Sequence, residues 1–218
     1  MVPQAIRMAE LAYKKFKTRD PYDIIDRKNI KIWLFSEPES LLGFYKVMNR
    51  KQYIGLNAEA DEVEKKTGAI HELGHALIDY KVAASGTEFR DSFADYRSFS
   101  FSNAPSEFHA NLTGADLCID DDFILNSIHY EPYCRVIAYI NEHIGEYRSA
   151  KAKMQFEEEQ LQEFYEYNSD IPSYEQLASE LGIAVQMVKF KFKAMTYRDY
   201  YLPNIPETES DFLKNWRK

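Results

Sequence analysis

The 218-residue sequence predicts an α+β fold, in which a small antiparallel three-stranded sheet packs on one helix and a mostly helical C-terminal part follows. Apolar residues recur with the helical period before about residue 27 and after about residue 60. The segment between them instead has short, bounded apolar runs that are typical of strands. Because helices flank the strands rather than alternate with them, the order favours α+β over βαβ units.

The first elements follow from this patterning. An amphipathic helix is expected over residues 4–17, and Asp20-Pro21 supplies an N-cap and a first-turn proline for a short helix through Asp26. Asn49-Arg50-Lys51 is expected to form a tight hairpin connection. The strand candidates are residues 30–35, 43–48 and 53–56. The helical period then returns over residues 60–81.

The rest of the chain is expected to be loop and helix. Residues 82–103 form a loop-rich section, after which Asn103 would cap a helix that has Pro105 in its first turn and runs to about residue 119. Residues 121–167 have mostly helical patterning, and two short helices are expected around Gly182. We therefore expect one domain over residues 1–130 and a helical C-terminal region over residues 131–218.

Composition and charge exclude several classes of protein. A hydrophobic fraction of 45%, with eight Gly and eight Pro, is ordinary for a folded soluble domain. The formal net charge of −8 disfavours binding to the phosphate backbone of nucleic acids, so direct nucleic-acid binding is not expected. No secretory signal and no long apolar run is visible, so no membrane span is expected. Cys118 and Cys134 are too few for a disulfide scaffold, which favours a cytoplasmic location.

The most informative segment is His71-Glu72-Leu73-Gly74-His75. Residues four apart share one helix face, so both imidazoles point toward one place, where they suit Zn²⁺. Glu72 lies about a hundred degrees around the helix, beside the metal rather than on it. Its carboxylate can therefore take a proton from the zinc-bound water and pass it to a leaving amine. The alternative is a buried helix with two satisfied histidines.

Two imidazoles leave a catalytic zinc one protein ligand short. Glu107 is the favoured third ligand, because small residues on its helix face, including Asn111 and Gly114, would let two helices approach closely. Asn111 could then hydrogen-bond the ligating carboxylate. Asp91 is the alternative ligand, whereas His109 would point to the opposite side of the helix from Glu107.

Residues 173–195 have the spacing of a DNA-binding helix-turn-helix, with Gly182 at the turn and Lys189, Lys191 and Lys193 after it. Because the chain is acidic, a hairpin that completes the fold is favoured over DNA binding, and docking of a protein partner is a third use. The acidic run at residues 157–159 is expected to be a solvated helix face.

These residues carry a family resemblance. The segment from His71 to Leu77, followed by Glu107-x-x-Ala110-Asn111 and Ala115-Asp116-Leu117, resembles the ImmA/IrrE family of metallo-endopeptidases. Leu42-Gly43-Phe44-Tyr45 and Asn49-Arg50-Lys51-x-x-Ile54 are similar to that family's strand pair. The resemblance covers roughly residues 20–125. Where many members have Phe-Ala, this chain has Thr113-Gly114, which puts the local packing in question.

The resemblance implies a zincin-like metallopeptidase domain over residues 1–130. It implies His71, His75 and Glu107 as zinc ligands and Glu72 as the catalytic carboxylate. Members encoded on phages and mobile elements cleave helix-turn-helix repressors, so a repressor is the implied protein substrate. The alternative function is a DNA- or protein-binding regulator that uses the C-terminal hairpin and has a structural or vestigial metal site.

Several roles stay open from the sequence. An extended substrate would add to the edge of the strand at residues 43–48 or at residues 53–56. His129 and His143 are expected to be surface or satisfied core histidines. The candidates for a group that stabilises the oxyanion are Tyr80, Tyr96, Tyr130 and His109.

Overall fold

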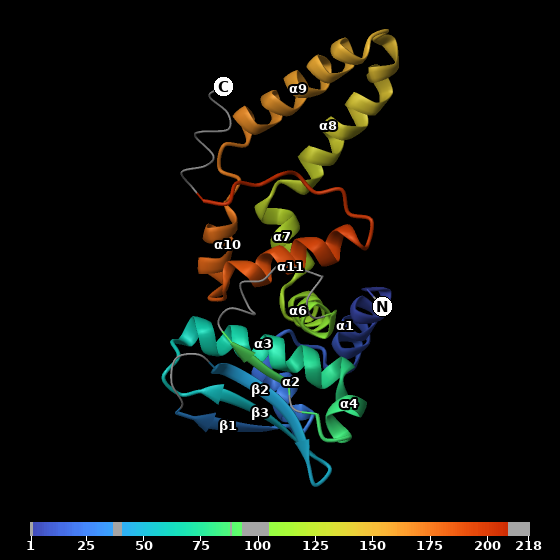
Figure 1. Ribbon diagram of the computed structural model, residues 1–218. Helices are drawn as coiled ribbons and strands as arrows, with labels where there is room; N and C mark the ends of the chain where they lie inside the picture. Colours follow the sequence, from blue (N-terminus) through green and yellow to red (C-terminus); the bar gives the residue numbers. More distant parts are fainter. Residues whose placement is uncertain (1, 37–40, 88, 93–104, 209–218) are drawn as a thin grey trace. The chain divides into compact units, whose positions relative to one another are not determined.

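The structure is a computed structural model that describes residues 2–36, 41–87, 89–92 and 105–208 (Figure 1). It confirms the α+β class. The chain divides into two compact units. The first, here called the sheet unit, comprises Met1–Asp120 and Ala178–Asp199, and the second, the helical unit, comprises Asp121–Leu177 and Tyr200–Lys218. This division differs from the expected boundary between residues 130 and 131, because the chain returns to the sheet unit after Leu177.

The sheet unit combines a four-stranded sheet with helices that come from both ends of the chain. Its elements are α1 (Val2–Phe16), α2 (Pro21–Arg27), β1 (Lys31–Phe35), β2 (Leu41–Met48), β3 (Lys51–Asn57), α3 (Glu62–Ile78), α4 (Tyr80–Ala84), β4 (Phe89–Ser92), α6 (Pro105–Cys118) and α11 (Val185–Thr196). The cap expected at Asn103 lies outside the described residues.

The strands lie in the order β1-β3-β2-β4. β2 and β3 form the expected antiparallel hairpin, and its two turn residues, Asn49 and Arg50, have φ values of 50° and 63°. A two-residue turn with both residues in the left-handed backbone conformation has a twist that matches the right-handed twist of the strands it joins. The expectation of a wholly antiparallel sheet of three strands is wrong, because β1 lies beside β3 and runs parallel to it. β4, which the loop-like composition of residues 82–103 did not indicate, adds antiparallel to β2.

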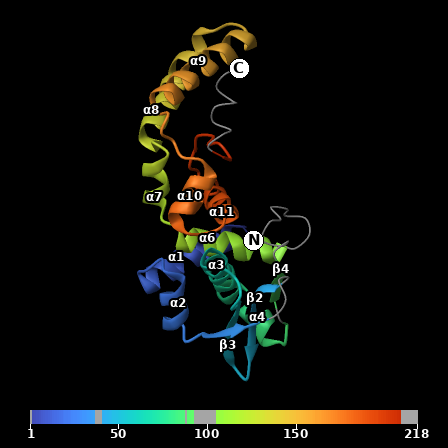
Figure 2. The same ribbon diagram turned by 90° about the vertical axis from the view of Figure 1, so that its left-hand side faces the viewer.

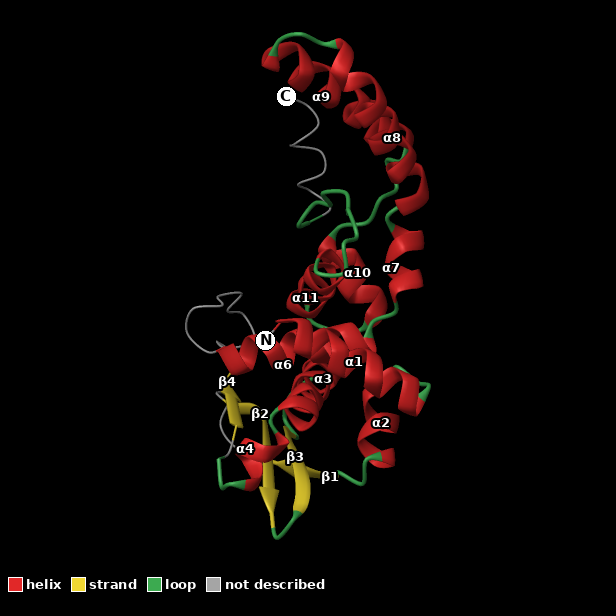
Figure 3. Ribbon diagram, turned by 90° about the vertical axis from the view of Figure 1, so that its right-hand side faces the viewer, coloured by secondary structure: helices red, strands yellow, loops and turns green. Residues whose placement is uncertain are grey.

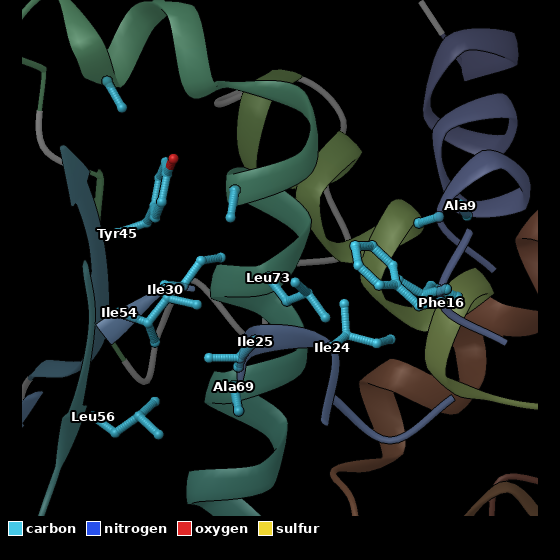
Figure 4. Packing of buried hydrophobic residues seen from close by; sticks show 14 residues of the cluster. Ala9, Phe16, Ile24, Ile25, Ile30, Tyr45, Ile54, Leu56, Ala69 and Leu73 are labelled. Carbon is cyan, nitrogen blue, oxygen red and sulfur yellow. The ribbon is translucent and has the colours of Figure 1, made fainter. Parts of the chain in front are cut away.

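The main core lies between one face of the sheet and α3, with α1 and α2 closing its side (Figure 4). Alternate residues of β2 and β3 supply the sheet side, including the fully buried Tyr45 and Ile54. Ala69 and Leu73 of α3 meet them. A capping box begins α3: Asp61 accepts the backbone N–H of Glu64, whose carboxylate accepts the N–H of Asp61. These local and tertiary contacts together fix the orientation of α3 on the sheet.

The second helix of the C-terminal hairpin, α11, packs on α6 within the sheet unit. Phe190 contacts Phe108 edge to face, with ring centroids 5.5 Å apart. Lys191 is fully buried, and its Nζ lies 2.9 Å from Asp116 Oδ1, an oxygen that Arg198 also contacts at 2.8 Å. The apolar face of α11 and the central lysine of its predicted basic run are therefore part of the packing. This supports the hairpin's expected role in completing the fold.

The helical unit is built around two antiparallel helices, α8 and α9 (Figure 3). Its described elements are α7 (Asp121–Ser127), α8 (Tyr130–His143), a 3₁₀ turn (Ile144–Glu146), α9 (Ala150–Tyr167) and the first half of α10 (Tyr174–Leu181). His129 and His143 are partly exposed, and they contact Asp170 Oδ1 and the Tyr139 carbonyl respectively, as expected of surface histidines. No helix among the described residues is long and apolar enough to cross a membrane.

Candidate metal centre

Three side chains from two helices converge on one point in the sheet unit. His71 and His75 come from α3, and Glu107 comes from the first turn of α6. The Nε2 atoms of the two histidines lie 3.1 Å apart, and Glu107 Oε2 lies 3.1 Å from each of them. These residues form a group that could hold a metal ion. The structure thus brings together the three ligands expected from the sequence.

The two helices approach closely because each has a glycine where they cross (Figure 2). A Cβ atom on Gly74 would lie 2.1 Å from the carbonyl oxygen of Ala110, and one on Gly114 would lie 2.3 Å from that of Ile70. Such distances are impossible for real side chains, so both positions need a hydrogen. The expectation that small residues allow this approach is confirmed, and the approach explains the glycine at position 114.

Each histidine is oriented through its other ring nitrogen. His71 Nδ1 donates to Asn111 Oδ1 at 2.7 Å, and His75 Nδ1 donates to Asp79 Oδ2 at 2.7 Å. Ser106 Oγ donates to the same Asp79 oxygen at 2.8 Å. Asn111 was expected to hydrogen-bond the Glu107 carboxylate, but it accepts a hydrogen bond from the His71 imidazole instead. Asp79 and Ser106 were not singled out from the sequence, although Asp79 lies one helical turn after His75.

The chemistry of this donor set fits a cation such as Zn²⁺. Since both Nδ1 atoms carry hydrogens, both neutral rings present Nε2 lone pairs to each other and to a carboxylate oxygen. These three groups repel one another unless positive charge lies between them. Ligand atoms bound at about 2.0–2.1 Å to a tetrahedral zinc lie roughly 3.3 Å apart, close to the observed spacing.

The same surroundings also favour a proton on His75. Burial disfavours the charged form of His75, but its hydrogen bonds to Asp79 and Glu107 favour that form. The net result is that the pKa of His75 is raised above its ordinary value. A metal ion must therefore displace a proton that this environment stabilises, so its affinity falls as the pH is lowered. Glu107 is 24% exposed, which leaves the group open to solvent on its side.

Glu72 follows His71 on α3 and is fully buried. Its carboxylate lies against Gly43 of β2, where an added Cβ atom would be 2.8 Å from Glu72 Oε1. Gly43 therefore leaves room for a carboxylate that any larger residue at that position would displace. Glu72 is not one of the three converging residues, in agreement with its expected place beside the metal.

β4 passes beside the centre. The ring of Phe89 stacks on His75, with centroids 4.5 Å apart and planes 24° apart. Asp91, the alternative ligand, lies on the same strand, where its backbone is opposite Gly43, and its side chain is outside the described residues. No sequence signal pointed to β4, since it is only four residues long.

The remaining candidates lie elsewhere. His109 is 7% exposed and is not part of the converging group, and burial lowers its pKa. Tyr80 lies in α4 with 42% of its surface exposed. Tyr130 belongs to the helical unit, and Tyr96 lies outside the described residues. No oxyanion-stabilising group is assigned from these positions.

Comparison with known proteins finds similarity to a phage protein. Over 65 residues the chain is 36% identical to "Uncharacterized immunity region protein 2" of Bacillus phage phi105. The matched part is 30% of this chain and 41% of the phage protein, so the chain spans less than half of that relative's length. No family model matches the sequence, and no solved structure matches it. The relation fits a phage or mobile-element context and assigns no activity.

Proposed function

We propose that this protein is a zinc-dependent endopeptidase of the ImmA/IrrE type that cleaves a helix-turn-helix repressor in the cytoplasm. The observation that carries the proposal is the convergence of His71 Nε2, His75 Nε2 and Glu107 Oε2 at mutual distances of 3.1 Å. Three protein ligands with a fourth position open are typical of catalytic rather than structural zinc sites. The buried Glu72 carboxylate on the same helix supplies the base that such a reaction needs.

The residues have separate tasks in this mechanism. A bound zinc would polarise the scissile carbonyl and make its water acidic enough to attack at neutral pH. His71, His75 and Glu107 would hold the ion, while Asn111 and Asp79 fix the two rings. Glu72 accepts the proton of the attacking water and donates it to the leaving amine.

The sequence-based expectation that an extended substrate adds to the edge of β2 or β3 must be corrected. Both strands named there, β2 and β3, have a partner strand on each side, so neither is an edge. The outer strand on the side of the metal centre, among the described residues, is β4. Its contact with His75 through Phe89 places its backbone next to the ligands. We therefore propose that an extended substrate pairs with β4.

The proposed substrate class rests on the phage relation and on the resemblance at the metal motif. Proteins of a phage immunity region suit a repressor-related role, which supports a repressor as substrate. The alternative, a regulator that reads DNA with the C-terminal hairpin, is less well supported. In a helix-turn-helix the second helix must present its side chains to the major groove. Here α11 buries Met187, Phe190 and Lys191.

Replacing Glu72→Gln tests the proposal. The variant is expected to keep about one zinc per chain and to lose proteolysis by a factor of about 10² or more, because an amide cannot accept the proton of the water. Zinc content is measured on purified protein, and cleavage is followed with candidate repressors. Glu107→Ala, which removes one of the three converging groups, serves as the control that loses the metal. A Glu72→Gln protein that cleaves at the wild-type rate would show that the mechanism is wrong.

A further inference from the structure

The helical unit contains a groove that the metal site does not use. It lies between α8 and α9 and encloses about 430 Å³. Its lining is largely apolar and aromatic, from Pro132, Val136, Tyr139, Phe164 and Tyr167. Two of these rings are strongly solvent-exposed, Tyr139 at 46% and Tyr167 at 82%. Large exposed aromatic side chains that flank a hollow are characteristic of protein-binding surfaces.

The segment that forms the second half of α9, one side of the groove, is strongly acidic. From residue 157 to residue 170 the chain has six Asp and Glu and no Lys or Arg. Glu163 lines the groove itself. Arg135 is the one basic residue of the lining, and it forms an ion pair with Glu131 one helical turn away. Acidic residues therefore prevail along the second half of α9, and one of them, Glu163, lines the aromatic groove.

The acidity is a property of this unit and not of the whole chain. The helical unit holds fifteen acidic and seven basic residues, whereas the sheet unit holds twenty of each. The formal net charge of −8 therefore belongs entirely to the unit that contains the groove. A neutral metallopeptidase unit and an acidic helical unit are suited to different partners.

We propose that the α8–α9 groove binds an arginine- and lysine-rich helix of a protein partner. Long basic side chains can contact this surface in two ways, because their aliphatic stems pack on aromatic rings while their charged ends reach carboxylates. The inference rests on the proposed function in identifying the partner as the repressor, whose DNA-binding helix has this chemistry. A repressor held in this way could not contact its operator at the same time. Operator DNA would then protect the repressor from cleavage.

The test uses the full chain with Glu72→Gln, so that binding is measured without cleavage. The probe is a fluorescent alanine-based helical peptide of about 18 residues with arginine at every fourth position, alongside its citrulline analogue. The arginine peptide is expected to bind with an affinity that falls as salt is raised, and the citrulline peptide is expected to bind at least about tenfold more weakly. Equal binding of both peptides would overturn the proposal.

Two groove variants locate the site. Glu163→Lys and Tyr167→Ala are each expected to weaken peptide binding about tenfold, which corresponds to about 1.4 kcal/mol. Glu158→Lys is the matched control, since it makes the same charge change at an exposed position on the same helix but outside the groove lining. If Glu158→Lys weakens binding as much as Glu163→Lys, the peptide recognises diffuse charge and not the groove.

Two other occupants are distinguished by the same assay. The C-terminal residues Lys214, Arg217 and Lys218 are also basic, and they belong to the helical unit. If replacing all three by alanine strengthens peptide binding, the groove is filled by the chain's own end and the proposal is wrong. Self-association that Tyr167→Ala abolishes would assign the groove to a second copy instead. None of these measurements depends on zinc, so failure of the proposed peptidase activity leaves them interpretable.

Discussion

The crossing of α3 and α6 differs from the turn between α8 and α9 in how much room the backbone leaves for a side chain. At the crossing, a Cβ atom on Gly74 or Gly114 would collide with a carbonyl of the other helix. In the turn between α8 and α9, a Cβ atom on Gly145 would meet nothing within 4 Å. The first pair holds three side chains that could bind one metal ion at fixed separations, whereas the second presents a surface. Close convergence of side chains from two helices thus leaves no room for a methyl group at the crossing, and the turn between α8 and α9 has no such restriction.

The largest effect is expected from a substitution that disrupts the crossing of α3 and α6. Gly74→Ala forces a methyl group against the backbone of Ala110, which cannot rotate away as a side chain can. We expect the free energy of unfolding to fall by about 3 kcal/mol or more, together with loss of zinc. Gly145→Ala is the matched substitution in the turn between α8 and α9. It should change the free energy of unfolding by less than about 0.5 kcal/mol. Urea denaturation and zinc content measure both, and equal stability of the two variants would refute the comparison.

Removal of one ligand gives the next largest effect. Glu107→Ala should lower zinc affinity by more than about 100-fold, because two imidazoles leave the ion under-coordinated. Loss of a residue that only hydrogen-bonds a ligand typically lowers metal affinity by about 10–100-fold. The fold should persist, since Glu107 is partly exposed. Glu158→Ala on α9 should bind zinc like the wild type. Competition titration with a chelator gives the affinities. Full affinity in Glu107→Ala with a loss in Asp91→Ala would transfer the third ligand to β4.

The smallest expected effect concerns β2, which adjoins α3 at Glu72. Gly43→Ala places a methyl group 2.8 Å from Glu72 Oε1, so the carboxylate must shift. The Gly55 carbonyl oxygen would lie 3.1 Å from the same methyl group and need move only slightly, so we expect a smaller loss of stability than in Gly74→Ala and zinc content close to that of the wild type. Turnover should fall about tenfold, because a displaced base accepts the proton less well. Steady-state kinetics should show the loss in kcat. An unchanged kcat would mean that Gly43 has no bearing on Glu72.

The sequence by itself determined the features that depend on near neighbours along the chain. The spacing of His71, Glu72 and His75 follows from the helical repeat, and the capping residues before α3 and the turn residues of the β2–β3 hairpin are equally local. Glu107 could also be found, because the small residues of α6 recur with the same repeat and indicate the face on which another helix lies. For these features, periodicity is set by the covalent backbone and needs no knowledge of distant segments.

Only the tertiary structure decided which distant segments pair. β1 could lie on either side of the hairpin, and β4 is too short to carry a pattern. α11 packs on α6 although residues 121–177, which belong to the helical unit, separate the two helices in the sequence. The links from Ser106 to Asp79 and from Asp79 to His75 likewise depend on where α6 meets the end of α3. Such contacts are selected by the combined burial and hydrogen bonding of the whole unit, because many pairings satisfy the local pattern equally well and only one fills the core.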